Sequence, residues 1–167
     1  LLSDLKNVLL NGVNGNKQLY KELVSSIKNS VLTAYYTPQP VISAVSENIQ
    51  RIFSKNDLVI NSFLETSAGI GGFLPVANNA INKVAFEKDL VTGLILSSLE
   101  ADTKVFIDGF ETIESKELDN SSFDIIASNI PFGNFKIYDA DFSQKGEPYI
   151  SSAKTIHNYF FIKAISL

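Results

Sequence analysis

The residues best suited to chemistry form a short turn that begins at Asn129 and continues through Ile130, Pro131 and Phe132. An aromatic amine such as the N6 amine of adenine is a poor nucleophile, because its lone pair is delocalised into the ring. Two hydrogen-bond acceptors placed on the amine hydrogens would stabilise the positive charge that develops during attack. The side-chain oxygen of Asn129 and the carbonyl of Ile130 could supply this pair. Pro131 would stiffen the turn, and Phe132 could stack on a base, a contact worth about 1–3 kcal/mol. The alternative is an ordinary Asn-x-Pro turn that closes a strand.

A second candidate is the glycine-rich turn that follows Glu65. Glycines allow the backbone to approach a ligand closely. An acidic residue here, and the absence of a GxxxxGK[ST] sequence, argue against a phosphate-binding loop and favour a zwitterionic or amine-bearing ligand. The alternative is a tight turn with no ligand. The candidate binding residues of the turn are Glu65, Ser67, Ala68, Gly69 and Gly71.

Two further acidic residues occupy comparable positions. Glu87 lies 18 positions after Gly69, close to the spacing at which βαβ units bind ribose hydroxyls. Asp108 could accept from an exocyclic amine such as that of adenine, with Phe110 lying near the ring. The alternatives are a solvated Glu87 beside a helix-capping Asp89, and a plain Asp-Gly turn.

Each of these residues follows a short apolar run, and the runs predict four buried strands. They are continuous rather than alternating, which is typical of parallel strands covered on both faces. Helices are predicted between them, so the chain is interpreted as α/β and Rossmann-like. Ligands bind such sheets at the carboxyl ends of the strands. The predicted strands span 58–64, 84–86, 105–107 and 123–127, and the helices between them 73–81 and 90–99.

The first 57 residues predict a helical segment, and residues 58–167 predict the α/β domain. Apolar spacing over residues 1–33 indicates two short helices around a turn at 11–15. The next helix should open at Thr37 and Pro38, with the threonine as cap and the proline in the first helical position.

The composition fits a folded domain of 167 residues, with 45% hydrophobic and 19% charged residues. The absence of cysteine excludes disulfides and cysteine-zinc sites, and a single histidine excludes a multi-histidine metal site, so no metal is expected. No apolar stretch approaches the ~20 residues of a membrane span, and no signal peptide is recognisable. A cytoplasmic location without membrane contact is therefore expected.

Together these motifs resemble the S-adenosylmethionine (SAM)-dependent adenine-N6 DNA methyltransferases. The SAM-binding motif of that family is similar to residues 64–71, its catalytic Asn/Asp-Pro-Pro-Tyr/Phe resembles 129–132, and its upstream Phe/Tyr-Thr-Pro matches 36–38. The motif order agrees with the modification subunits of type I restriction systems. Residues 129–133 and 156–161 look closer still to methylase regions of large helicase–methylase proteins of mobile elements.

The resemblance implies a role for each candidate. Thr37 would contact the carboxylate of SAM, Glu65 its methionine amine, Glu87 its ribose hydroxyls and Asp108 its adenine amine. Asn129 and Phe132 would hold the target adenine, which must be flipped out of a duplex because its N6 amine is not accessible there.

One departure from the family concerns Ile130, which stands where the family has proline. Its carbonyl can still accept a hydrogen bond, but the turn loses rigidity, so reduced or absent activity is an open alternative. Other substrates also remain open: the N4 amine of cytosine, an RNA base, or a glutamine side chain. A degenerate, non-catalytic module of a larger protein is a further alternative.

The family needs more strands and a target-recognition region after this point. The chain has a net charge of −4 and lacks the basic character of a DNA-binding face. We therefore expect an incomplete sheet, DNA contacts made by missing regions of a larger polypeptide, and no activity from this chain alone. Residues 133–155 predict a mobile flap or, alternatively, disorder. His157 is expected to pack or hydrogen-bond locally.

Overall fold

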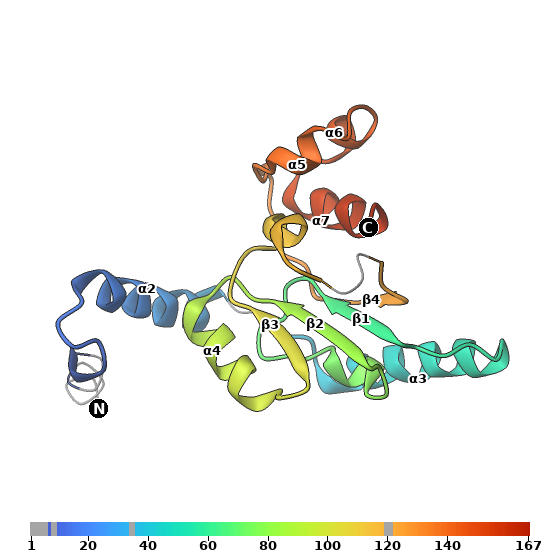
Figure 1. Ribbon diagram of the computed structural model, residues 1–167, viewed down its shortest axis with the longest axis horizontal. Coiled ribbons are helices and arrows are strands. Elements are labelled where there is room, and N and C mark those ends of the chain that lie inside the picture. Colours follow the sequence, from blue (N-terminus) through green and yellow to red (C-terminus); the bar gives the residue numbers. More distant parts are fainter. Residues whose placement is uncertain (1–6, 8–9, 34–35, 119–121) are drawn as a thin grey trace.

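The computed structural model describes residue 7 and residues 10–33, 36–118 and 122–167. The described chain is built around a parallel sheet with helices on both faces (Figure 1). The strands are β1 (Ser62–Glu65), β2 (Asn82–Phe86), β3 (Thr103–Phe106) and β4 (Ile125–Ile126), in the order β3-β2-β1-β4. All pairs are parallel. The predicted α/β, Rossmann-like fold is confirmed.

Alternate strand residues point to opposite faces of the sheet and enter two separate hydrophobic clusters. Phe63 and Ala85 lie in the first cluster, whereas Leu64, Val84 and Phe86 lie in the second. All five side chains are buried, because helices cover both faces.

The first face is covered by α3 (Gln39–Lys55), the short 3-10 helix η1 (Leu74–Ala77) and α4 (Leu90–Leu99). The second face is covered by the 3-10 helix η2 (Phe110–Ser115), α5 (Ala140–Ser143) and α7 (Ile156–Ile165). The short helix α6 (Tyr149–Ser152) contacts α7. Figure 1 shows α5, α6 and α7 gathered on one side of the sheet.

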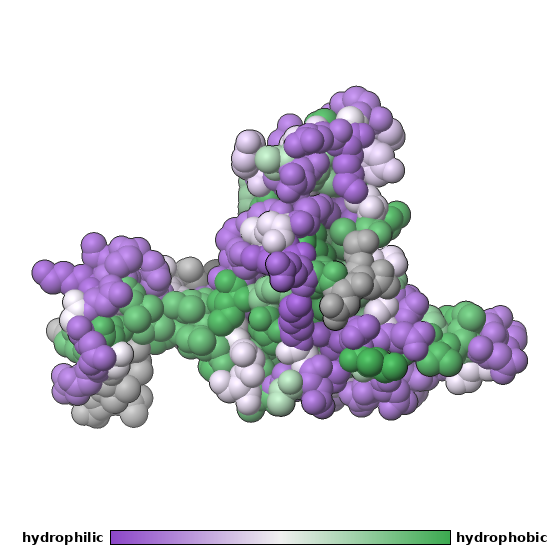
Figure 2. Space-filling model, viewed as in Figure 1, coloured by the Kyte–Doolittle hydropathy of each residue, from purple (hydrophilic) through white to green (hydrophobic). Residues whose placement is uncertain are grey.

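The N-terminal helix α2 (Lys17–Thr33) extends away from the sheet and contacts α4. The buried Ser26 hydroxyl accepts a hydrogen bond from the Val91 amide, at 2.9 Å. Hydrophobic residues are visible along α2 toward its junction with α4 (Figure 2). The turn expected at 11–15 is present at 13–15, after a helical stretch that ends at Gly12, and Asn14 and Gly15 adopt positive φ there. The helix expected before this turn falls largely outside the described residues.

Several predicted elements differ in the structure. Residues 73–81 form only the four-residue η1 and turns, with a proline in its first turn. The helix after Thr37 begins at Gln39 with Pro38 at its N-cap and no side-chain hydrogen bond, so the threonine cap and the proline in the first helical position were both wrong. The segment 133–155 contains α5 and α6 rather than one irregular connection, and Asp139 caps α5 through the Phe142 amide.

Among the described helices, none has the length and apolarity needed to cross a bilayer.

Gly71 is required where the turn after β1 meets the core. Its φ is +82°, and a Cβ atom there would lie 2.7 Å from Leu96 and 2.8 Å from Leu74. Gly71→Ala should therefore lower the free energy of unfolding by at least about 2 kcal/mol, through backbone strain and overpacking. Urea denaturation measures this loss.

The matched control for this prediction is Gly72→Ala. A Cβ atom at Gly72 would lie 3.5 Å from Ile42, an ordinary contact, at a φ that needs no glycine. We expect the control to change stability by less than about 0.5 kcal/mol. Equal losses in the two variants would contradict the account of this turn.

Candidate active site

The two motifs that sequence analysis singles out first lie side by side at the carboxyl ends of β1 and β4. The strand order reverses between these two strands, which is where open α/β sheets bind ligands. The Ala127 amide donates to the Leu64 carbonyl at 3.1 Å. The Ser128 hydroxyl accepts from the Ser67 amide at 3.0 Å and donates to the Ser67 carbonyl at 3.2 Å. The glycine-rich turn and the Asn129 turn are thus joined directly.

Glu65 is an acidic side chain in the interior, with 1% of its surface exposed. Its Oε1 accepts from the Phe73 amide at 3.1 Å, while its buried Oε2 has no hydrogen-bond partner among the described residues. Burial, with a smaller contribution from the nearby Glu87 charge, raises the pKa of Glu65 from 4.5 to about 8. Leaving a buried acceptor unpaired is costly, so this oxygen fits a site that receives a donor from a ligand.

The glycine-rich turn is held by Glu87 at the end of β2. Gly69, at a φ of +57°, donates its amide to Oε2 of Glu87 at 2.7 Å, and Oε1 accepts from the Asp89 amide at the same distance. Burial raises the pKa of Glu87. Ala68 donates its amide to the Phe86 carbonyl at 2.9 Å. Glu87 therefore fixes the turn, and each carboxylate oxygen retains a further lone pair.

The upstream motif reaches the same turn. The Tyr36 ring lies 3.4 Å from the position that a Cβ atom on Gly69 would occupy. The Tyr36 side chain is exposed, and Thr37 beside it is half-buried. The structure thus places Tyr36, the first residue of this motif, next to the glycine-rich turn, across more than 30 residues of sequence.

The residues after β3 have local partners that sequence analysis did not anticipate. Asp108 accepts from Lys116 Nζ at 2.6 Å and from the Gly109 amide at 2.9 Å, and the Lys116 contact lowers the pKa of Asp108. Phe110 is buried in the second cluster, with its ring centroid 5.3 Å from that of Phe160. The Phe110 ring is therefore part of the core and is not exposed for the expected contact with an adenine ring.

The turn after β4 exposes one side chain and partly buries another. Ile130 packs against the second hydrophobic cluster and so anchors the turn at the position where the methyltransferases that the sequence resembles have proline. Phe132 is 77% exposed, and its ring centroid lies 6.2 Å from that of His157. His157 Nε2 lies 3.0 Å from the Thr155 hydroxyl, in agreement with the expected local role. Asn129 and Pro131 are half-buried.

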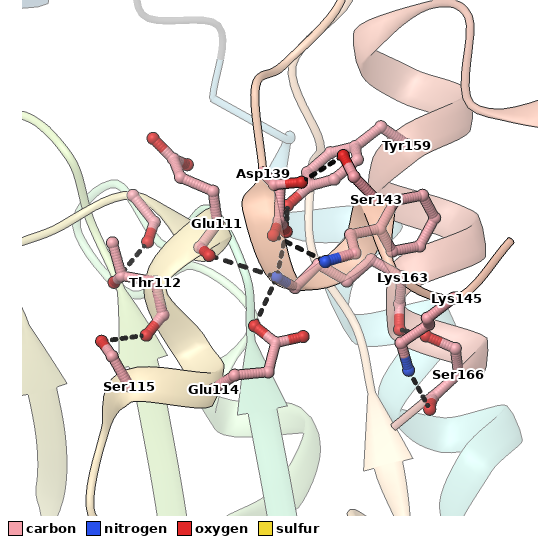
Figure 3. Close-up of polar contacts among 12 residues, drawn as sticks. Glu111, Thr112, Glu114, Ser115, Asp139, Ser143, Lys145, Tyr159, Lys163 and Ser166 are labelled. Carbon is pink, nitrogen blue, oxygen red and sulfur yellow. Dashed lines mark hydrogen bonds and ion pairs between the residues drawn. The ribbon is translucent and has the colours of Figure 1, made fainter. Parts of the chain in front are cut away.

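Sequence analysis missed a buried ionic network around Lys163 (Figure 3). Lys163 is fully buried; its Nζ donates to Asp139, to Glu114 Oε2 at 2.6 Å and to the Glu111 carbonyl at 3.2 Å. The Tyr159 hydroxyl donates to Asp139 at 2.5 Å. Although burial opposes it, the Lys163 hydrogen bond helps to lower the pKa of Asp139. The network ties α7 and the start of α5 to η2, and its one sequence signal is a lone lysine within an apolar helix.

No protein-family model matches the sequence, and no curated protein sequence matches it. Among solved structures, the chain is similar to the modification subunit of a proposed type I restriction enzyme from Vibrio vulnificus, with a TM-score of 0.54 and 15% identity. That match covers 89% of this chain and 34% of the subunit, so the chain spans about a third of its length. A proposed RNA methyltransferase from Pyrococcus horikoshii matches with a TM-score of 0.41 and 25% identity, over 68% of this chain and 60% of that one. The first likeness supports a methyltransferase-like fold.

The raised pKa of Glu65 predicts a specific pH dependence of stability. The folded state holds this proton up to about pH 8, whereas the unfolded chain releases it near pH 4.5, so stability falls as the pH rises through this window. Glu65→Gln removes this contribution and leaves in place that of Glu87, whose pKa is also raised. The difference in unfolding free energy between variant and wild type should therefore grow by roughly 2–3 kcal/mol between about pH 6 and pH 9.

Denaturation at a series of pH values measures this difference. Glu47→Gln, which alters an exposed glutamate of α3, is the control and should run parallel to wild type. A constant difference between Glu65→Gln and wild type would show that Glu65 is already ionised in the folded protein.

Proposed function

We propose that this chain is the cofactor-binding and catalytic part of a SAM-dependent methyltransferase that acts on the N6 amine of adenine in DNA. The observation that carries the proposal is the juxtaposition of buried Glu65 and the Asn129 turn, on the two strands between which the sheet order reverses. A cofactor and an amine substrate would meet at the carboxyl ends of these two strands. The methyltransferase-like fold is consistent with this arrangement.

The chemistry of the residues around β1 and β2 fits SAM. The unpartnered Oε2 of Glu65 would accept from the methionine ammonium, and Glu65 would ionise as this cation arrives. Thr37 would contact the carboxylate, and the turn containing Ser67, Ala68, Gly69 and Gly71 would lie along the methionine part. The remaining lone pairs of Glu87 would accept from the ribose hydroxyls. Asp108 would bind the adenine amine while it stays paired with Lys116.

The Asn129 turn would prepare the substrate amine for attack. When bound, SAM supplies an electrophilic methyl group. The Asn129 side-chain oxygen and the Ile130 carbonyl would each accept one amine hydrogen, which localises the lone pair on nitrogen and stabilises its developing positive charge. The exposed Phe132 ring would stack on the flipped base. Packing of Ile130 in the core would keep its carbonyl in place without the proline of the family.

Adenine in DNA is favoured among possible amine substrates by the motif order, with residues 36–38 upstream and the Tyr36 ring beside Gly69 of the glycine-rich turn. A net charge of −4 suits a catalytic part better than a phosphate-binding one. DNA would therefore be held chiefly by other regions of a larger polypeptide.

Asn129→Ala should lower the rate of methyl transfer from SAM to adenine in DNA by about 100-fold or more, because one of the two acceptors is lost. SAM affinity should not change. The measurement is incorporation of a labelled methyl group into DNA by the full-length protein, followed by identification of the methylated base.

The matched control is Asn79→Ala, which removes an exposed amide in the turn between η1 and β2, at the opposite end of the sheet. It should leave the rate unchanged. Unaltered methylation in Asn129→Ala would contradict the proposed mechanism, and label on cytosine, RNA or glutamine instead of adenine would contradict the proposed substrate.

A further inference from the structure

The segment that follows the Asn129 turn exposes an unusual set of aromatic side chains. Phe132, Phe135 and Tyr138 are 77%, 54% and 86% exposed, and they lie within seven consecutive residues. Large apolar side chains that cluster on a surface often mark an interaction site, whereas single exposed apolar residues are common on any protein. The function proposed above assigns a role to Phe132 alone.

The backbone that presents these rings is anchored at both ends. Ile130 and Ile137 pack against the second hydrophobic cluster, so inward aliphatic side chains alternate with the outward aromatic ones along this segment. Asp139, immediately after Tyr138, is buried and held by Lys163 and Tyr159 (Figure 3). Because its ends are fixed, this segment can present its rings to a ligand at a low entropic cost.

Gly133 brings two of the rings to the same place. A Cβ atom at Gly133 would lie 2.5 Å from the Phe135 ring and 3.5 Å from Ile156, the first residue of α7. The Phe135 ring therefore packs on the backbone of Gly133, close to the start of α7. The Phe132 ring lies beside His157, the next residue of α7. Phe135 is thus a neighbour of the residue proposed to stack on the target base.

We propose that Phe135 and Tyr138 form a stacking platform for unpaired nucleotides that flank the flipped base. The proposal rests on the function above and extends its substrate site. Flat aromatic rings stack on any base, and an exposed cation beside them favours a polyanionic strand. Lys136 is that cation, and residues 131–138 contain no acidic residue although the whole chain has a net charge of −4.

Photocrosslinking to single-stranded DNA that contains 5-iododeoxyuridine tests the platform on this chain, because the reagent captures aromatic side chains stacked on it. Mass spectrometry should find adducts on Phe135 or Tyr138. Phe135→Leu and Tyr138→Leu should each weaken oligonucleotide binding by at least about fivefold in fluorescence anisotropy. Neither variant should change the dependence of affinity on salt, since no phosphate contact is lost, whereas Lys136→Gln should reduce that dependence.

Tyr20→Leu is the matched control, since Tyr20 is a partly exposed aromatic residue on the distant helix α2. This variant should bind DNA like wild type and keep the adducts on Phe135 or Tyr138, and in the wild-type chain Tyr20 itself should carry no adduct. Adducts that map only outside residues 131–138, unchanged affinity in both leucine variants, or no binding to any oligonucleotide would overturn the platform. An RNA strand of the same sequence identifies the preferred nucleic acid.

A parallel SAM titration separates this inference from the proposed function. A chain that binds SAM but shows no Phe135- or Tyr138-dependent DNA binding would retain the proposed function and lose the platform. A chain that binds DNA through these rings without binding SAM would retain the platform and lose the proposed function.

Discussion

The candidate site depends on the attachment of β4 to β1, and β4 contributes only two residues to the sheet. Side chains secure this short strand at both ends. At its amino end, Asp124 accepts from the amides of Asn61 at 2.8 Å and Ser62 at 2.9 Å, and at its carboxyl end Ser128 bridges to Ser67. The Asp124 and Ser128 contacts therefore set the distance between the glycine-rich turn and the Asn129 turn. Without these contacts, only the pairing of Ile125 and Ile126 with β1 would hold the Asn129 turn beside the glycine-rich turn.

The second constraint is that the site keeps a carboxyl group buried with one oxygen unpartnered among the described residues. A protein selected for stability alone would place an apolar residue at Glu65, since desolvation of the carboxylate raises its pKa to about 8. The cost makes sense where a cationic ligand restores the lost solvation. Glu87, which is half-buried, accepts hydrogen bonds from the loop backbone and so preserves the shape of the turn that such a ligand would enter.

The sheet and the placement of most candidate residues at its strand ends could be predicted from sequence, because continuous apolar runs and turn residues are local signals. The contacts that complete the site join residues far apart in the chain. Ser67 and Ser128 are 61 positions apart, and Lys163 is 49 from Glu114, so no local pattern reveals them. Phe110 was misplaced for a related reason: its position after a strand is visible in the sequence, whereas its burial against Phe160 depends on how α7 packs. Prediction also failed for 73–81, where apolar residues fill a core from turns rather than from a helix.

The central claim is that Glu65 receives the methionine ammonium of SAM, and calorimetric titration near pH 7 in buffers of different ionisation enthalpy tests it most directly. Glu65 must lose its proton when it binds a cation, so SAM should release up to one proton per site. Methylthioadenosine, which lacks the amino-acid part, should release none, and Glu65→Gln should abolish the release and weaken SAM binding. This account predicts proton release when SAM binds, no release when methylthioadenosine binds, and no release by SAM in the Glu65→Gln variant. Binding of SAM with no proton release and no effect of Glu65→Gln, or no binding at millimolar SAM, would contradict it.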